Sequence, residues 1–242
     1  MYARKLLLLF GLALGSGAVP LVAQADTLLV ASPSLGYDVA VVVLDLTPDG
    51  GRAPLVYLTD GFKWLDAGLA DTLRRLTATG AVRPARYVFV SSRPPGGGAD
   101  RREAEFLANP AYLQFFTETL LPAVEESVPH PVAAADRALV GLSFGGLNAA
   151  WFASRGAPFA HYGLLSPITY PYPKLTQDIA FGPAEGQRFF VSTGRYDAER
   201  YVDPLLALYR AAGTEVRELR TAGGHDFVNW LGQVEALLDF LF

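Results

Sequence analysis

Ser143 lies in Gly141-Leu-Ser-Phe-Gly145, a Gly-x-Ser-x-Gly pattern that could carry nucleophilic chemistry. A serine hydroxyl becomes a nucleophile when a neighbouring base accepts its proton. The apolar run 138–142 predicts a strand before the motif, and residues 147–155 predict a helix after it. This order is what a nucleophile elbow requires. The motif alone arises by chance in about one such glycine-rich chain in ten, so its partners decide the interpretation.

His225 is the predicted base. It follows two glycines in Thr221-Ala-Gly-Gly-His225, after a predicted strand and before the apolar helical pattern of residues 227–242. The chain has two other histidines, His161 and His130. His161 enters a predicted strand and His130 lies beside prolines, so we expect both to be structural. A lone surface histidine is the alternative reading of His225.

The third member should be a carboxylate that orients His225 and stabilises its imidazolium. Asp197 is the first acid after the predicted strand 189–193. Glu199 remains an alternative, although it falls in the first turn of the next predicted helix, where acids often interact with the helix dipole. Asp226 would have to fold back on its immediate neighbour, which is poor geometry.

The order serine, acid, histidine, each after a predicted strand, is typical of the α/β-hydrolase fold. An oxyanion hole needs two N–H donors. We expect one from Phe144, which follows the serine, and one from Phe62, which follows Gly61 in the loop after the third predicted strand. An ordinary Asp-Gly turn is the alternative for that loop.

These residues require a sheet to position them, and short β-rich runs alternate with helical patterns along the chain. The predicted strands are residues 28–31, 38–44, 54–58, 87–91, 138–142, 162–165, 189–193 and 215–220. We therefore predict an α/β-hydrolase fold with about eight mostly parallel strands flanked by helices. The connection 165–189 is short for a large lid domain, so we expect an open pocket shaped mainly by the loops between residues 92 and 136.

Composition excludes several classes of function. The chain has 242 residues, 51% of them hydrophobic, which suits a single domain with one sizeable core. A formal net charge of −4 gives no broad basic surface for nucleic acid. The absence of cysteine removes thiol nucleophiles, disulfides and thiolate metal sites, and the three histidines lack a ligand spacing. We expect no metal and no cofactor, and the sequence leaves the oligomeric state open.

The N-terminus has the pattern of a signal peptide. Arg4 and Lys5 precede the apolar run 6–14, and Ala23-Gln-Ala25 matches a cleavage site. We expect cleavage after residues 1–25, a mature domain over residues 26–242, and export to the periplasm or the medium without stable membrane insertion. A buried first helix or an uncleaved anchor is the alternative.

Several segments resemble one family of esterases, which includes enterochelin esterases and S-formylglutathione hydrolase, with the enterochelin (ferric siderophore) esterase-like branch the most similar. The similar segments are residues 56–64, 102–106, 116–122, 136–146, 194–197 and 223–230. The resemblance implies hydrolysis of a carboxylic ester by Ser143, Asp197 and His225 without a cofactor. We expect the chain to lack the N-terminal accessory domain of the larger enterochelin esterases, and it has Asp197 where a glutamate is often seen.

The same resemblance implies that Arg102 lies near the substrate and that Trp64 lies beside the oxyanion loop. A solvated arginine and a packing tryptophan are the structural alternatives. The expected function is an exported serine esterase acting on a small-molecule ester, with a siderophore-type ester as one candidate. Acyl transfer to an alcohol by the same residues, or a non-catalytic binding protein on this scaffold, are the alternatives.

Overall fold

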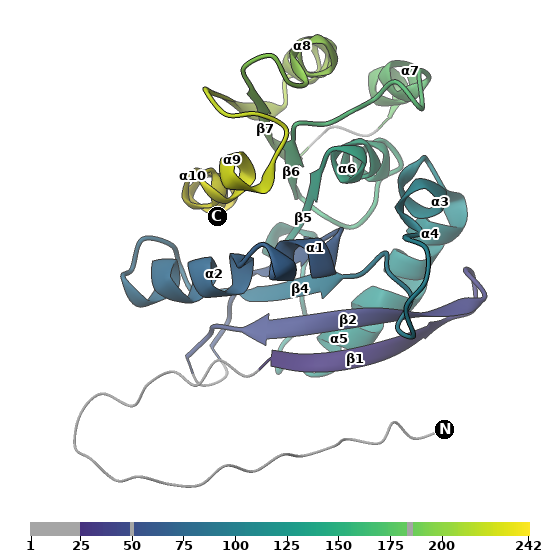
Figure 1. The fold of residues 1–242 in the computed structure, drawn as a ribbon, viewed down its shortest axis with the longest axis vertical. Helices are drawn as coiled ribbons and strands as arrows, with labels where there is room; N and C mark the ends of the chain where they lie inside the picture. The colour runs from purple at the N-terminus through teal and green to yellow at the C-terminus, as the bar shows by residue number, and fades with distance from the viewer. Residues whose placement is uncertain (1–24, 49–50, 183–185) are drawn as a thin grey trace, which may run out of the picture.

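The structure is a computed structural model that describes residues 25–48, 51–182 and 186–242. Its eight strands form one sheet in the order β1-β2-β4-β3-β5-β6-β7-β8 (Figure 1). They are β1 (Ala25–Ser32), β2 (Tyr37–Asp45), β3 (Leu55–Leu58), β4 (Arg86–Val90), β5 (Arg137–Leu142), β6 (His161–Leu165), β7 (Arg188–Gly194) and β8 (Glu215–Thr221). The pairs β1–β2 and β2–β4 are antiparallel and the other pairs are parallel. The predicted mostly parallel sheet is confirmed, with strand ends shifted by a few residues.

Helices cover both faces of the sheet (Figure 1). One apolar core lies under α1 (Gly61–Asp66), α2 (Leu69–Ala78), α9 (Phe227–Leu231) and α10 (Val234–Leu241). The other core lies under α3 (Arg102–Phe106), α4 (Pro110–Gln114), the π-helical turn η1 (Phe115–Leu120), α5 (Leu121–Glu125), α6 (Phe144–Ser154), α7 (Leu175–Phe181) and α8 (Glu199–Ala211). A 3₁₀ turn, η2 (Ala134–Asp136), precedes β5. Strands β3, β4 and β6 are buried along their whole length because helices pack on both of their sides.

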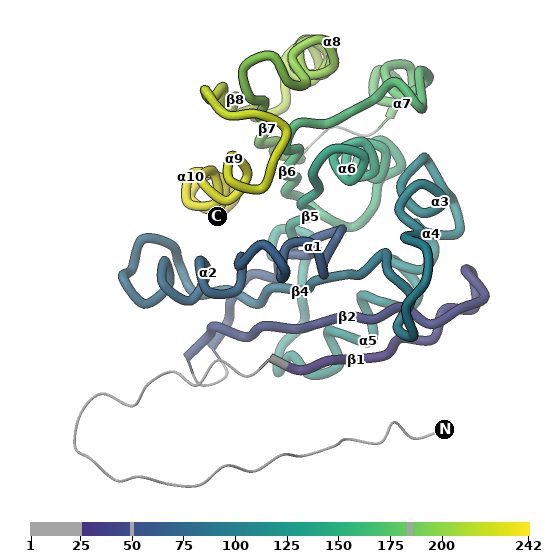
Figure 2. Tube along the Cα trace, in the orientation of Figure 1, coloured from purple at the N-terminus to yellow at the C-terminus, as the bar shows by residue number. Residues whose placement is uncertain are grey.

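The parallel register brings the carboxyl ends of the central strands to one edge of the sheet. Leu142 of β5 pairs with Leu165 of β6, which pairs with Ser192 of β7. The loops after these strands therefore open on the same edge, where ligands bind in open α/β sheets. Figure 2 shows that the loop between β8 and α9, in yellow, runs back toward the ends of β6 and β7.

Two regions differ from the expectations. The predicted final helix over 227–242 is two helices, because the chain turns at Gly232 and Gln233, and the Gln233 side chain donates to Asn229 Oδ1 (2.9 Å). The predicted loops between residues 92 and 136 contain short helices around a cluster of buried aromatic rings. Apart from Ala25, the predicted leader lies outside the described residues. In the part of the chain that the structure describes, no helix has both the length and the apolar character needed to cross a bilayer.

Glu105 is a buried carboxylate in this helical region. Its Oε1 accepts a hydrogen bond from the Tyr37 hydroxyl (2.9 Å), and Oε2 has no partner among the described residues. Burial raises the pKa of Glu105 from 4.5 to about 7, although the Tyr37 hydrogen bond and Arg101 oppose this shift. The folded protein therefore binds this proton more tightly than the unfolded chain does.

This raised pKa predicts a loss of stability as pH rises. Between the unfolded pKa of 4.5 and the folded pKa of about 7, the folded state binds more protons, so the free energy of unfolding falls with increasing pH. Glu105→Gln removes the titration and keeps an acceptor for Tyr37. Denaturant unfolding should show the wild type losing about 3 kcal/mol relative to the variant over this interval. Parallel pH profiles of the two proteins would contradict this assignment.

Candidate active site

Ser143 occupies a strained turn between β5 and α6. Its φ of 56° and ψ of −119° are unfavourable for a residue with a side chain. The Ser143 N–H donates to the Leu165 carbonyl (2.9 Å), and the Ser143 carbonyl accepts from the N–H of Ile168 (3.1 Å). A Cβ at Gly141 would lie 2.0 Å from the Gly145 carbonyl oxygen, so only glycine allows the helix to start this close to the strand. The predicted strand, turn and helix are all present.

His225 and Asp197 are in direct contact. His225 Nδ1 lies 2.6 Å from Asp197 Oδ1, and Asp197 Oδ2 accepts from the Gly194 N–H (3.3 Å). The Asp197 side chain is 2% exposed and the His225 side chain is 38% exposed. A carboxylate at Nδ1 favours the tautomer with its proton there, which leaves Nε2 as an acceptor. The pair can therefore act as an oriented general base.

The other acids near His225 have different partners. Glu199 begins α8 and lies 3.8 Å from Arg220. Asp226 caps α9, because its side chain accepts from the Asn229 N–H (2.9 Å). Asp197, not Glu199 or Asp226, is thus the carboxylate that contacts His225 in this structure.

Two residues that sequence reasoning missed connect His225 to the serine turn. The His225 ring meets the Trp230 ring edge to face, with centroids 4.9 Å apart. Trp230 Nε1 donates to Ser166 Oγ (3.1 Å). Ser166 directly follows Leu165, whose carbonyl holds the Ser143 N–H. Trp230 lies in the apolar helical pattern of residues 227–242, which predicts an ordinary core residue, and no sequence motif marks Ser166.

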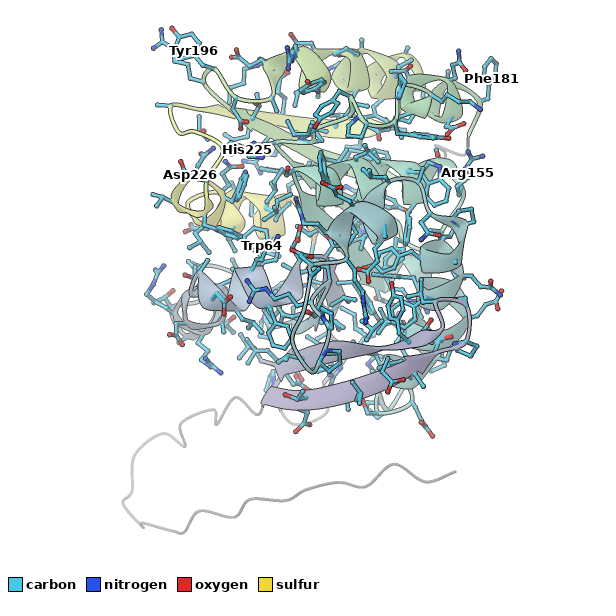
Figure 3. The ribbon with its side chains drawn as sticks, turned by 45° about the vertical axis from the view of Figure 1, so that its right-hand side comes forward. Trp64, Arg155, Phe181, Tyr196, His225 and Asp226 are labelled. Carbon is cyan, nitrogen blue, oxygen red and sulfur yellow. The ribbon has the colours of Figure 1, made fainter. Side chains whose placement is uncertain are left out.

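Ser143 and His225 thus lie at the same edge of the sheet, joined through Ser166 and Trp230. No hydrogen bond links Ser143 Oγ to His225 among the residues the structure describes. Figure 3 shows His225 and Asp226 side by side in the loop after β8. In this view Tyr196 lies above them and points away from the molecule, and Trp64 lies below them. The base is therefore reachable from the outside of the protein.

The two other histidines lie away from this edge. His161 begins β6 and is at the opposite end of the strand from Leu165, with Nε2 3.0 Å from the Ala135 carbonyl oxygen. Burial lowers the pKa of His161. His130 Nδ1 lies 3.3 Å from the Pro131 carbonyl oxygen. No group of three or more histidine, aspartate or glutamate side chains in the described ranges could hold a metal ion.

The predicted oxyanion donors are in the first turns of two helices. Phe144 is the first residue of α6, and Phe62 is the second residue of α1. First-turn N–H groups have no acceptor within their own helix and carry its positive dipole end. At Gly61, a Cβ would lie 2.5 Å from the Phe89 carbonyl carbon, so glycine lets this loop press against β4. Both donors can serve a negative charge that forms at the sheet edge.

The structure places Trp64 and Arg102 differently from each other. Trp64 is 1% exposed and packs edge to face on Phe227, with centroids 5.5 Å apart, so no surface remains for a substrate contact. Arg102 lies at the site, with its guanidinium carbon 5.3 Å from the centre of the Phe144 ring. Its Nε and Nη2 each donate to Asp60 over 2.9 Å.

A row of aromatic rings leads away from the serine turn. The centroids of Phe144 and Tyr170 lie 6.2 Å apart, and Tyr201 lies 6.2 Å beyond Tyr170. Tyr170 is 64% exposed, so its ring is open to contact with a ligand. Sequence reasoning did not single out Tyr170 or Tyr201, because no motif marks them.

The strand order and the serine turn between β5 and α6 define an α/β-hydrolase. The sequence profile of the family described as "Putative esterase" matches residues 32–206, and the chain belongs to this family. No curated protein sequence matches the chain.

Solved structures agree on the fold. The enterochelin esterase of Shigella flexneri superposes with a TM-score of 0.80 at 24% identity, over 93% of this chain and 59% of that one. A ferulic acid esterase matches with a TM-score of 0.74 at 21% identity, covering 90% and 97% of the two chains. An IroE-like serine hydrolase from Shewanella oneidensis matches with a TM-score of 0.69 at 19% identity, covering 90% and 79%. The chain thus spans about three fifths of the length of the enterochelin esterase.

Proposed function

We propose that the protein is a serine esterase that hydrolyses a carboxylic ester through an acyl-enzyme on Ser143. The observation that carries the proposal is the Asp197–His225 contact at the sheet edge where the serine turn lies. A carboxylate, an imidazole and a serine in these positions are what acyl transfer requires. A binding protein on the same scaffold needs none of the three.

The reaction proceeds in two halves. Ser143 Oγ attacks the ester carbonyl while His225 Nε2 accepts its proton, and Asp197 stabilises the resulting imidazolium. The N–H groups of Phe144 and Phe62 bind the tetrahedral oxyanion. Collapse expels the alcohol, which takes the proton from His225. Water then attacks the acyl-enzyme with His225 as base, and the carboxylic acid leaves while Ser143 Oγ regains its proton.

The aromatic row favours a substrate with an aromatic group. Rings prefer offset or edge-to-face contacts, which Phe144, Tyr170 and Tyr201 can offer to a planar acyl or alcohol group. The solved structures with this fold include a ferulic acid esterase and an enterobactin esterase determined in the presence of 2,3-dihydroxy-N-benzoyl-serine. Ferulic acid and the benzoyl compound are both aromatic. We therefore include aromatic esters, among them siderophore-type esters, in the proposed substrate class.

An organophosphonate probe tests the mechanism. The wild type should gain one probe mass on the peptide that contains Ser143, whereas Ser143→Ala should gain none. A panel of aliphatic, aromatic and ferric siderophore esters, each assayed with and without added alcohol, separates hydrolysis from acyl transfer. A wild type that neither labels nor turns over any ester would refute the proposal, and ester products formed with added alcohol would favour acyl transfer.

A further inference from the structure

Asp60 is a buried carboxylate next to the predicted oxyanion loop. It lies between β3 and α1, directly before Gly61 and Phe62, and its side chain is 0% exposed. Its φ of 58° is in the left-handed region, which aspartate adopts more readily than most residues with a side chain. The esterase chemistry proposed above assigns no role to this carboxylate, yet an ionised group at this depth requires compensating partners.

Arg102 supplies that compensation with defined geometry. Its Nε donates to Asp60 Oδ1 and its Nη2 to Asp60 Oδ2, both over 2.9 Å. Two parallel bonds of this kind fix orientation as well as charge. Lys63 Nζ lies 3.6 Å from Asp60 and 2.6 Å from Asp100. Asp100 in turn accepts from the Arg102 backbone N–H (3.1 Å). Two acids and two bases thus form a cluster without net charge.

The Asp60–Arg102 pair lies close to both sides of the predicted oxyanion hole. On one side, Asp60 belongs to the loop that carries Phe62 into α1. On the other, Asp60 Oδ2 lies 3.5 Å from the position that a Cβ of Gly145 would occupy, against the first turn of α6. The Arg102 guanidinium carbon is 5.3 Å from the centre of the Phe144 ring. The pair therefore lies where the two donor segments meet.

We propose that the Asp60–Arg102 pair is a positioning device, which holds the Phe62 and Phe144 segments in register and neutralises the Asp60 charge beside the developing oxyanion. The inference rests on the esterase function proposed above. Without Arg102, the buried Asp60 carboxylate would keep only the more distant Lys63 ammonium (3.6 Å) and would repel negative charge on the substrate oxygen. Loss of the two parallel bonds would also release one donor segment from the other, and small displacements of oxyanion donors are costly.

Arg102→Met tests the proposal on an uncharged ester such as p-nitrophenyl butyrate. We expect kcat to fall about 10²-fold with KM nearly unchanged, because the loss concerns the transition state. A boronic acid that forms a tetrahedral adduct on the serine should lose affinity by a similar factor. Arg102→Lys keeps the charge without the two parallel bonds and should give an intermediate loss.

Arg93→Met is the matched control. Arg93 lies between β4 and α3 and pairs with Asp66 at the end of α1 over 2.8 Å. It therefore links the same region of the chain as the Asp60–Arg102 pair, in which Asp60 precedes α1 and Arg102 begins α3, but at an exposed position. We expect its kinetics to match the wild type, because exposed pairs contribute little. If Arg102→Met does not fold, the double variant Asp60→Asn with Arg102→Met removes the buried charge as well and should fold. Its kcat should recover the part lost to charge repulsion but stay below the wild type, because the two parallel bonds are still missing.

Three outcomes would overturn the proposal. The first is full kcat in Arg102→Met or in the double variant. The second is a raised KM for anionic esters with unchanged kinetics for uncharged ones, which would make Arg102 a substrate contact. The third is a loss of kcat without a loss of boronate affinity. Failure of the esterase function itself is distinct, because the wild type would then show no turnover that depends on Ser143.

Discussion

Ser143→Ala is expected to lower kcat for ester hydrolysis by about 10⁵-fold or more, while the protein stays folded. The variant removes the only oxygen proposed to form the acyl-enzyme. No other residue of the turn Gly141-Leu-Ser-Phe-Gly145 has a nucleophilic side chain that His225 could activate instead. The remaining activity would come from substrate binding and the oxyanion donors. Steady-state assays on an uncharged ester, with thermal unfolding as a check of the fold, measure the effect.

Ser154→Ala provides the control for this variant. Ser154 ends the same helix, α6, and its buried hydroxyl donates to the Trp151 carbonyl (2.7 Å), far from the turn. It should keep wild-type kcat, so any general effect of altering α6 would be visible. Retained turnover in Ser143→Ala would exclude the acyl-enzyme on this residue.

Asp197→Asn is expected to lower kcat about 10⁴-fold with a small change in KM. The amide keeps the shape of the carboxylate but cannot stabilise the imidazolium, and its N–H₂ can hold His225 in the wrong tautomer. Substrate affinity depends little on this buried contact. Assays of kcat and KM across the pH range of the wild type measure the loss.

Glu199→Gln separates the two acids that the sequence leaves as candidates. Glu199 lies two residues after Asp197, and its carboxylate faces Arg220 rather than His225. We expect this variant to retain kcat within about twofold, since the pair it removes is exposed. A large loss in Glu199→Gln together with normal turnover in Asp197→Asn would reverse the assignment.

The sheet and the order of the candidate residues could be predicted from the sequence because both are local signals. Apolar runs between turn residues indicate strands, and Gly141-Leu-Ser-Phe-Gly145 records a close approach that only glycine permits. The bond from Trp230 to Ser166 could not be predicted, because it joins residues 64 positions apart without any motif. The same applies to Arg102, whose partner Asp60 is 42 positions away.

Other differences arise from packing rather than from pattern. The apolar spacing of residues 227–242 fits one helix, but the bond from Gln233 to Asn229 accompanies a break between α9 and α10. Trp64 follows the oxyanion loop in sequence, yet its ring turns into the core against Phe227. Side-chain direction depends on the neighbouring helix, which a local reading does not include.

The place of each strand in the sheet bears on how activity is lost. β5, which carries Ser143, is in the middle of the sheet and buried, whereas β8, which precedes His225, is at one end and partly exposed. Segments with few buried contacts open at lower free energy than the core does. The base should therefore detach while the nucleophile is still in place. Inactivation by denaturant is then expected to precede the loss of the far-ultraviolet circular dichroism signal. The resistance of the activity to denaturant would thus depend on the edge strand β8 rather than on the stability of the whole fold.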